Sequence, residues 1–440
     1  MAAHAKFRFR SSAELKAKAG ELGLDLPFED DISPLFEAVV VAGRTLPNRL
    51  AVLPMEGADA EASGAPSEMT LRRYRRLAAG GSGLVWFEAT AVGPQGRSNP
   101  RQLMLTEGTV AAFSRLVEEA RAAAARAPEA KGRPLLILQL THSGRFSKPQ
   151  GTPQPAVVHR SPYLDPLHGL PPDFPLLTDM ELETVRDDLV EAAELAAAAG
   201  FDGVDIKACH GYLLSELLAA HTRTGSRYGG TFEGRTRLLL ETVRTIRRDD
   251  PGLLLTSRFS AADTVPFPYG FGMDPDSPAT PRLEEPMALV SKLVEAGVGL
   301  LAYSLGIPYW KPQYGRPFDT PIPGGKTPDE HPLEGVARHL RVATEIQRAF
   351  PDVPLVGAGY TWLRRFFPHV AAAMVRAGRT AVVGLGRGAL AYPDLAADLA
   401  GKGRLDSRKV CTTCSLCSLL LRQGGPSGCA LRDAEVYRIS

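Results

Sequence analysis

The feature that most restricts the fold of this 440-residue chain is a repeated pairing of an Ala-rich helix with a short apolar strand. Each helical pattern ends at an Ala-Gly pair, and an apolar segment follows within a few residues. Glycine suits this position because it can close a helix in the left-handed conformation. The pairing recurs at Ala79-Gly80, Ala199-Gly200, Ala296-Gly297 and Ala377-Gly378. Strands that alternate with helices pair in parallel, so the repeat predicts an α/β fold.

Eight apolar segments have the length and composition of buried strands. They are NRLAVLP, GLVWFEA, PLLILQL, FDGVDI, LLLTSRFS, VGLLAYS, VPLVGAG and RTAVVG. Eight strand and helix units predict a closed (β/α)8 barrel, the TIM barrel. A doubly wound sheet is the alternative, but its glycine fingerprint GxGxxG is missing after the first strand. In a barrel, functional side chains lie just beyond the carboxyl ends of the strands.

The connection after the third strand is long for a compact domain. Residues 143–177 are rich in Pro, Gly and polar side chains, which is typical of a lid or a substrate wall. Thr178 and Glu181 then have the spacing of a capping box, so a helix should begin there.

Composition and charge exclude several classes of protein. The chain is 44% hydrophobic and 23% charged, as in ordinary globular proteins and unlike disordered ones. Its net charge of +2 is too small for a nucleic-acid-binding surface. No apolar run reaches the roughly 18 residues of a membrane span, and the N-terminus lacks the apolar region of a signal peptide. We expect a cytoplasmic protein with a small-molecule substrate, for which a homo-oligomer is one option.

Four of the five cysteines lie close together near the C-terminus, with the spacing CxxCxxCx11C. They are Cys411, Cys414, Cys417 and Cys429. This distribution is poor for disulfides and typical of a metal site in a reducing compartment. Three cysteines at short spacing predict a 4Fe-4S cluster, whereas zinc is the alternative because four-cysteine zinc sites also use CxxC pairs. Cys209 has no such partner and is expected to be a small packed side chain.

Six segments from about Ser33 onward resemble, in the same order, the Old Yellow Enzyme family. They are LFEAVVVAGRTLPNRLAVLPM (35–55), GLVWFEATAVGPQGR (83–97), LQLTHSGR (138–145), GFDGVDIKACHGYLLSELL (200–218), RYGGTFEGRTR (227–237) and VVGLGRGALAYPDL (382–395). In the larger relatives, trimethylamine dehydrogenase and 2,4-dienoyl-CoA reductase, a similar cysteine motif follows the barrel and nucleotide-binding domains follow the motif. The resemblance implies an N-terminal arm (1–32), an FMN-binding barrel (33–400) and a cluster-binding segment (401–440).

The resemblance implies an FMN site at the barrel rim. Gln139 would hydrogen-bond the pyrimidine edge of the flavin, and the Arg258 cation would lie beside the ring to stabilise the reduced anion. Glycines in VGAG (356–359) and GLGRG (384–388), together with Arg387, would hold the phosphate through N–H donors and a cation. The implied cofactor-binding residues are Pro54, Met55, Glu56, Ala89, Gln139, Arg258, Gly357, Gly359, Gly386 and Arg387. Noncovalent FMN is expected, since Glu56 stands where the amine dehydrogenase has its flavin-linked cysteine.

The catalytic residues implied by the resemblance follow the fourth strand. Lys207 and His210 would grip the substrate oxygen, and Tyr212 would donate a proton. The usual residue at the first of these positions is His or Tyr, and Thr or Cys is common at position 56, so Lys207 and Glu56 are both departures. An acid at position 56 either pairs with a nearby cation or titrates anomalously.

Three functions follow from these features. The first is a reductase of activated C=C bonds, in which a 4Fe-4S cluster relays electrons from an electron-transfer protein or subunit, or NAD(P)H reduces the FMN directly. The second is an amine dehydrogenase that passes electrons outward, which Lys207 disfavours because two cations repel in a closed site. The third is a zinc-stabilised barrel without catalysis.

Overall fold

The eight predicted strands form the wall of a closed barrel. The computed structural model describes residues 3–127 and 132–438. Neighbouring barrel strands pair in parallel, in the order β10-β3-β4-β5-β6-β7-β8-β9. They are β3 (Leu50–Val52), β4 (Leu84–Ala91), β5 (Leu135–Thr141), β6 (Gly203–Ile206), β7 (Leu254–Ala262), β8 (Leu300–Leu305), β9 (Leu355–Gly357) and β10 (Val382–Leu385). The predicted (β/α)8 barrel is confirmed, and the doubly wound alternative is excluded because such a sheet has two free edges.

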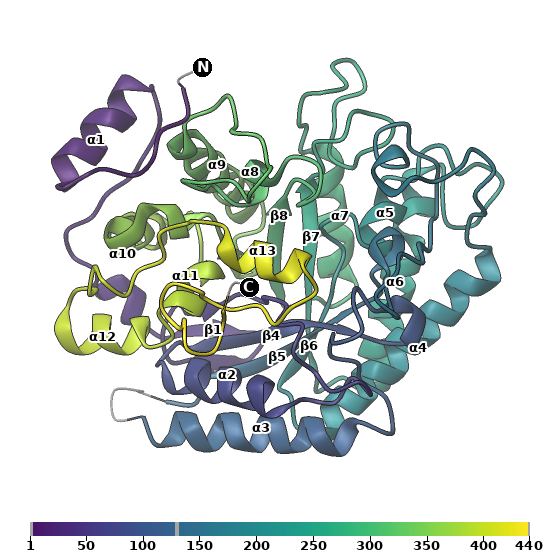
Figure 1. Ribbon diagram of the computed structural model, residues 1–440, viewed down its shortest axis with the longest axis horizontal. Coiled ribbons are helices and arrows are strands. Elements are labelled where there is room, and N and C mark those ends of the chain that lie inside the picture. Colours follow the sequence, from purple (N-terminus) through teal and green to yellow (C-terminus); the bar gives the residue numbers. More distant parts are fainter. Residues whose placement is uncertain (1–2, 128–131, 439–440) are drawn as a thin grey trace.

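A helix follows each strand, and these helices cover the outside of the barrel (Figure 1). They are α2 (Glu68–Ala79), α3 (Val110–Ala125), α4 (Asp179–Ala198), α6 (Phe232–Asp249), α7 (Glu284–Glu295), α9 (Pro332–Ala349), α10 (Phe367–Arg376) and α12 (Leu395–Lys402). Shorter helices lie in the loops: α5 (Leu213–Leu218), α8 (Pro312–Gly315), α11 (Arg387–Ala391) and α13 (Leu416–Arg422). The predicted capping box is present, since the side chain of Thr178 accepts from the backbone N–H of Glu181.

The helix-ending glycines behave as predicted at three of the four sites. Gly200, Gly297 and Gly378 have φ values of 91°, 100° and 62°. Gly80 differs, with φ −74°, and the left-handed residue is its neighbour Gly81. A Cβ at Gly80 would lie 1.9 Å from the carbonyl oxygen of Pro393, so glycine is needed there for close approach of two backbones.

A short hairpin closes the amino end of the barrel. Its strands β1 (Val39–Val41) and β2 (Arg44–Leu46) pair antiparallel. Val41 and Leu46 are fully buried in one apolar cluster with Trp86 and other barrel residues. Full burial of one such side chain contributes roughly 1.5–3 kcal/mol to the stability of the folded protein. The amino end is therefore part of the core, and the functional loops gather at the carboxyl end.

The N-terminal arm packs against the barrel. Its helix α1 (Ser12–Glu21) buries Leu15 and Ala19 in the main core cluster. Phe28 stacks on His369 of α10 with the ring centroids 4.9 Å apart. The division of the chain at residues 32 and 400 stays a prediction. In the described part of the chain, no helix has the length and hydropathy of a membrane span.

Candidate active site

A cavity of about 220 Å³ lies at the carboxyl ends of the barrel strands. With one exception, it is lined by every residue predicted for the cofactor or the substrate: Pro54, Met55, Glu56, Ala89, Gln139, Lys207, His210, Tyr212, Arg258, Gly359, Gly386 and Arg387. The exception is Gly357, which lies within β9, where a Cβ would meet Thr380 Oγ1 at 2.8 Å and the Tyr360 hydroxyl at 2.9 Å. Glycine at position 357 thus serves packing beneath the cavity.

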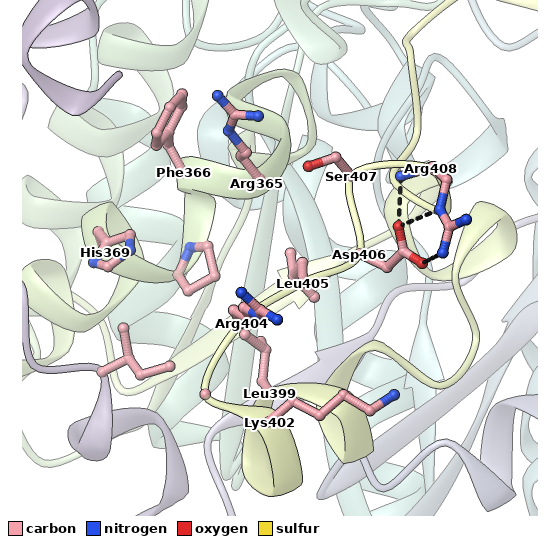
Figure 2. Close-up of a pocket in the computed structure, with 13 residues that line it drawn as sticks. Arg365, Phe366, His369, Leu399, Lys402, Arg404, Leu405, Asp406, Ser407 and Arg408 are labelled. Atoms are coloured by element: carbon pink, nitrogen blue, oxygen red, sulfur yellow. Dashed lines mark hydrogen bonds and ion pairs between the residues drawn. The ribbon is translucent and has the colours of Figure 1, made fainter. Parts of the chain in front are cut away.

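A larger cavity, of about 690 Å³, lies between α10 and α12 (Figure 2). Its wall carries basic side chains, including Arg365, Lys402 and Arg404, together with the ion pair between Asp406 and Arg408. None of the predicted catalytic or cofactor-binding residues lines it. Size alone therefore does not identify the active site, and the convergence of polar side chains at the strand ends does.

Gln139 is held in place by Asp205, a residue that the sequence analysis missed. Gln139 Nε2 donates to Asp205 Oδ2 at 2.5 Å, and Asp205 Oδ1 accepts from the backbone N–H of Arg258 at 2.7 Å. The bond leaves Gln139 Oε1 available as an acceptor. Burial raises the pKa of Asp205 to about 6, against the opposing effect of the Gln139 hydrogen bond. Asp205 lies in an otherwise apolar strand, and only that placement could have signalled it.

Two of the arginines that line this cavity have a buried nitrogen that lacks a hydrogen-bond partner among the described residues. They are Nε of Arg258 and Nη1 of Arg387. Arg316, which the sequence analysis did not identify, also lines the cavity. Its pKa is lowered to about 9, mainly by burial and to a smaller extent by the positive charge of Arg387. Arg316 and Arg387 together form a cationic corner that an anionic group would stabilise.

Two glycines, Gly359 and Gly386, also line the cavity beside this corner, and the backbone conformation at position 359 requires glycine. A Cβ at Gly386 would lie 2.8 Å from Met55 Sδ, and one at Gly359 would lie 2.6 Å from His339 Cβ. Gly359 also has φ 94°, which other residues rarely adopt. The donors and the space at this corner fit a phosphate, and those near Gln139 and Arg258 fit a polar ring edge. The cavity therefore fits FMN.

The two departures from the family pattern contact each other. Lys207 Nζ lies 3.7 Å from Glu56 Oε1 and 3.5 Å from the centroid of the Tyr212 ring. Tyr212 donates its hydroxyl proton to the same carboxylate oxygen at 2.8 Å. Burial and the negative charge of Glu56 hold the pKa of Tyr212 well above its usual value. Burial lowers the pKa of Lys207, and Glu56 opposes that shift. Tyr212 thus keeps its proton at neutral pH.

His210 faces the same cavity from the loop after β6. Its backbone has φ 69°, and its Nε2 lies 2.7 Å from Ser304 Oγ. Burial, with the nearby charges of Arg258 and Lys207, holds its pKa well below the usual value. The imidazole is therefore neutral at physiological pH and can offer one N–H donor.

Aromatic side chains form the outer wall of the site. Tyr309 lines the cavity and stacks on Phe146 at a centroid distance of 4.4 Å. Phe146 also approaches Tyr212, at 5.9 Å, within a buried apolar cluster that includes Leu164. Phe146 and Leu164 belong to the 143–177 connection, which thus packs behind the wall of the site. None of its residues lines the cavity itself, so its role as a lid or substrate wall stays a prediction.

The four C-terminal cysteines line a second, smaller cavity. Cys411, Cys414, Cys417 and Cys429 all contribute to it. Cys417 and Arg387 line both cavities, which makes the two sites neighbours. Across residues 3–127 and 132–438, no group of three or more His, Cys, Asp or Glu has the arrangement that would hold a single metal ion. Cys209 is fully buried elsewhere in the core, as predicted.

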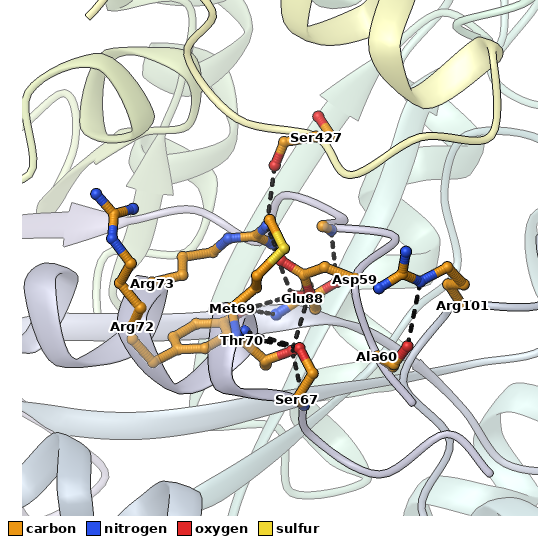
Figure 3. Close-up of polar contacts among 12 residues, drawn as sticks. Asp59, Ala60, Ser67, Met69, Thr70, Arg72, Arg73, Glu88, Arg101 and Ser427 are labelled. Carbon is orange, nitrogen blue, oxygen red and sulfur yellow. Dashed lines mark hydrogen bonds and ion pairs between the residues drawn. The ribbon is translucent and has the colours of Figure 1, made fainter. Parts of the chain in front are cut away.

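A buried ionic network joins the cysteine segment to the barrel (Figure 3). Arg73 of α2 donates to Glu88 of β4 at 3.0 Å, pairs with Asp59, and donates to the backbone oxygen of Ser427 at 2.9 Å. The backbone N–H of Ser427 donates to Gly57 O at 2.6 Å. These contacts fix the loop before Cys429 against the loop that carries Glu56.

Comparison with known proteins finds a matching family and several relatives of similar sequence. The model of the NADH:flavin oxidoreductase / NADH oxidase family matches residues 34–269. An NADH oxidase of Thermoanaerobacter brockii is 28% identical over 387 residues, which are 87% of this chain and 53% of that protein. An NADPH dehydrogenase of Halalkalibacterium halodurans is 32% identical over 232 residues, 52% of this chain and 64% of that protein. The chain thus spans about half the length of the NADH oxidase.

Solved structures share the fold at lower sequence identity. A 2-naphthoyl-CoA reductase in complex with 2-naphthoyl-CoA has a TM-score of 0.71 and 19% identity, over 91% of this chain and 57% of that one. A histamine dehydrogenase from Rhizobium sp. 4-9 has a TM-score of 0.68 and 21% identity, over 91% of this chain and 52% of that one.

Proposed function

The chain belongs to the NADH:flavin oxidoreductase / NADH oxidase family, and from that premise we propose that it is an FMN-dependent reductase of activated C=C bonds. The observation that carries the proposal is Tyr212, a protonated tyrosine that faces the cavity beside two candidate donors for a substrate oxygen, Lys207 and His210. Hydride addition to a C=C bond needs such a proton donor for the neighbouring carbon. Oxidation of an amine does not.

We propose that FMN binds noncovalently in the same cavity. Gln139 and Arg258 would contact the ring, and Arg316, Arg387, Gly359 and Gly386 would surround the phosphate. Bound there, FMN would supply hydride transfer between NAD(P)H or another electron donor and the substrate. Lys207 and His210 would bind the substrate oxygen, and Tyr309 would lie in the wall beside the bound substrate.

The structure weakens one argument against an amine substrate. Lys207 alone would repel an ammonium group, but Glu56 lies 3.7 Å from it, so the pair carries no net charge when both are ionised. The preference for a reductase therefore depends on Tyr212 rather than on the charge of Lys207.

We propose a 4Fe-4S cluster on Cys411, Cys414, Cys417 and Cys429, exchanging single electrons with an electron-transfer protein or subunit. A zinc ion bound at about 2.3 Å by each sulfur would bring the sulfurs to within about 4 Å of one another. A cluster places iron and sulfide between its ligands and needs a wider set. The support for the cluster is the short spacing of the first three cysteines, together with the position of all four cysteines around one cavity. The shared wall at Cys417 supports electron exchange with the FMN site.

The test uses anaerobically purified holoprotein and compares two reactions. We expect cyclohexenone to reoxidise the reduced flavin, and a tertiary amine to leave the oxidised flavin unchanged. Flavin reduction by the amine, with no reaction of the enone, would replace the reductase with the dehydrogenase. A preparation without flavin absorbance would support the non-catalytic barrel.

A further inference from the structure

Tyr212 must regain a proton after each turnover, and the structure shows a route from solvent to its oxygen. Tyr212 donates to Glu56 Oε1 at 2.8 Å, and Glu56 Oε2 accepts from Ser98 Oγ at 3.0 Å. The Glu56 side chain is only 12% exposed, whereas Ser98 is half-buried and its hydroxyl accepts from Asn99 at 3.2 Å. A carboxyl and a hydroxyl group, both able to pass protons, thus connect the buried tyrosine to the surface.

Lys207 does not offer an equivalent route. Its Nζ lies over the face of the Tyr212 ring, 3.5 Å from the centroid, and its ion pair is with Glu56 at 3.7 Å. Glu88 and Tyr309 are the other titratable groups whose charge couples to Glu56. The two carboxylate oxygens of Glu88 accept hydrogen bonds from the backbone N–H of Gly57 and from Arg73. Both oxygens are therefore engaged away from Tyr212. Glu56 is the group that touches the reacting hydroxyl.

We propose that Glu56 and Ser98 return a proton from solvent to Tyr212 in every catalytic cycle. The inference rests on the proposed function, in which Tyr212 protonates the substrate carbon. In that step the Tyr212 O–H bond breaks, a C–H bond forms on the enolate left by hydride addition, and tyrosinate remains. Ser98 then passes its proton to Glu56 Oε2 and takes another from water. After rotation of its carboxyl group, Glu56 gives the proton to the tyrosinate oxygen.

The relay predicts a difference between the first turnover and later ones. In Glu56→Gln, Tyr212 is still protonated at the start, so the first reoxidation of reduced flavin by cyclohexenone should be slowed far less than the later ones. Repeated turnover should slow by about 100-fold, the lower end of general acid-base contributions. Ser98→Ala should show the same pattern with a smaller loss, because water can replace a half-buried hydroxyl.

Three measurements separate this relay from a structural role. Because Glu56 also lines the cavity and pairs with Lys207, each rate of Glu56→Gln is compared with its own turnover with ferricyanide, which needs no carbon protonation. The relay predicts that enone turnover falls much further than ferricyanide turnover. Formate should partly restore enone turnover in Glu56→Ala. An infrared difference spectrum recorded during enone turnover should contain a carboxylic acid carbonyl band that disappears in Glu56→Gln. The control is Gln95→Ala, an exposed change in the same loop as Ser98, which should match the parent protein.

The outcomes distinguish the inference from the function on which it rests. An unchanged first turnover in Tyr212→Phe would overturn the proposed function. A slow first turnover in Tyr212→Phe, combined with normal repeated turnover in both Glu56→Gln and Ser98→Ala, would overturn only the relay. The relay would also be overturned if Glu56→Gln slowed the first turnover as much as later ones, or slowed the ferricyanide reaction equally.

Discussion

At the scale of single residues, the site is organised by charges that neutralise each other inside the cavity. Lys207 is 4% exposed and Glu56 is 12% exposed, and each lies next to Tyr212. The sequence left two options open for Glu56, pairing with a cation or anomalous titration, and the structure shows the pairing. The sequence could not identify the cation because residues 56 and 207 come together only when the barrel closes.

Replacing Lys207 with Met should weaken the binding of a phenolate over the flavin. The variant loses the cation and leaves Glu56 as an unpaired negative charge. We therefore expect the affinity for phenolate to fall by roughly 10- to 100-fold, the range for a charged hydrogen bond. Titration of the flavin absorbance with a substituted phenol measures it. The double variant Lys207→Met/Glu56→Gln is the control, and it should recover part of the affinity. Intact phenolate affinity with tighter binding of a tertiary amine would favour the dehydrogenase.

Asp205 should make the stability of the protein depend on pH in a defined direction. Its pKa is about 6 in the folded protein, above the ordinary value of 3.8, so the folded state binds the proton more tightly than the unfolded state. This contribution to stability is full below about pH 4 and is lost as the pH rises to about 6. Two pKa units correspond to about 3 kcal/mol as an upper limit. Denaturant unfolding of the flavin-free protein should show that the free energy of unfolding of the parent protein falls over this pH range and that Asp205→Asn lacks this fall. An equal dependence of the free energy of unfolding on pH in the two proteins would contradict the role of Asp205.

At the scale of elements, all eight strands and the start of α4 could be predicted because the signal for each lies within a few neighbouring residues of the sequence. Apolar runs bounded by Gly and Pro mark the strands, and the Thr178 and Glu181 pair marks the helix start. The β1–β2 hairpin, Arg316 and Tyr309 were missed, since their roles depend on distant segments that close the barrel or line its cavity. The role of Gly80 could not be predicted for the same reason, because the backbone that it contacts, at Pro393, is more than 300 residues away in the sequence.

The Arg73 network should matter far more for stability than a comparable pair at the surface. Arg73→Met leaves Asp59 and Glu88 buried without a cation, for which we expect a loss of 3–5 kcal/mol, on the order measured for broken buried pairs. The matched control is Arg72→Met on the same helix, which removes a partly exposed pair with Asp433 and should cost about 1 kcal/mol or less. Chemical unfolding of both flavin-free variants tests the contrast. Similar losses in the two would show that the network is not a principal attachment of the cysteine segment.

At the scale of the whole molecule, two cavities share a wall at Cys417 and Arg387 and together would form one redox unit. Protein prepared without oxygen should contain iron and inorganic sulfide at roughly four each per chain. Cys429→Ser should lose the iron and keep FMN, whereas Cys209→Ser, a change in the core, should keep both. Metal and sulfide analysis decides this, and stoichiometric zinc in the parent protein would contradict it.

Noncovalent FMN is the second expectation for the whole molecule. The cationic corner of Arg316 and Arg387 would hold the phosphate by hydrogen bonds and charge alone. Residue 56 lines the same cavity and is a glutamate, so it offers no thiol for a covalent bond to the flavin. Acid precipitation should therefore release all the flavin into the supernatant. Flavin that stays in the pellet would show a covalent link.

The most direct test of the account is a single-turnover measurement on Tyr212→Phe. Anaerobically reduced holoprotein is mixed with cyclohexenone, and flavin reoxidation is followed by absorbance. Tyr163→Phe, which changes a tyrosine behind the aromatic wall, is the matched control and should react like the parent protein. We predict that Tyr212→Phe slows reoxidation by about 100-fold or more, the loss expected for a missing general acid. An unchanged rate in Tyr212→Phe would contradict the assignment of this protein as a reductase of activated C=C bonds.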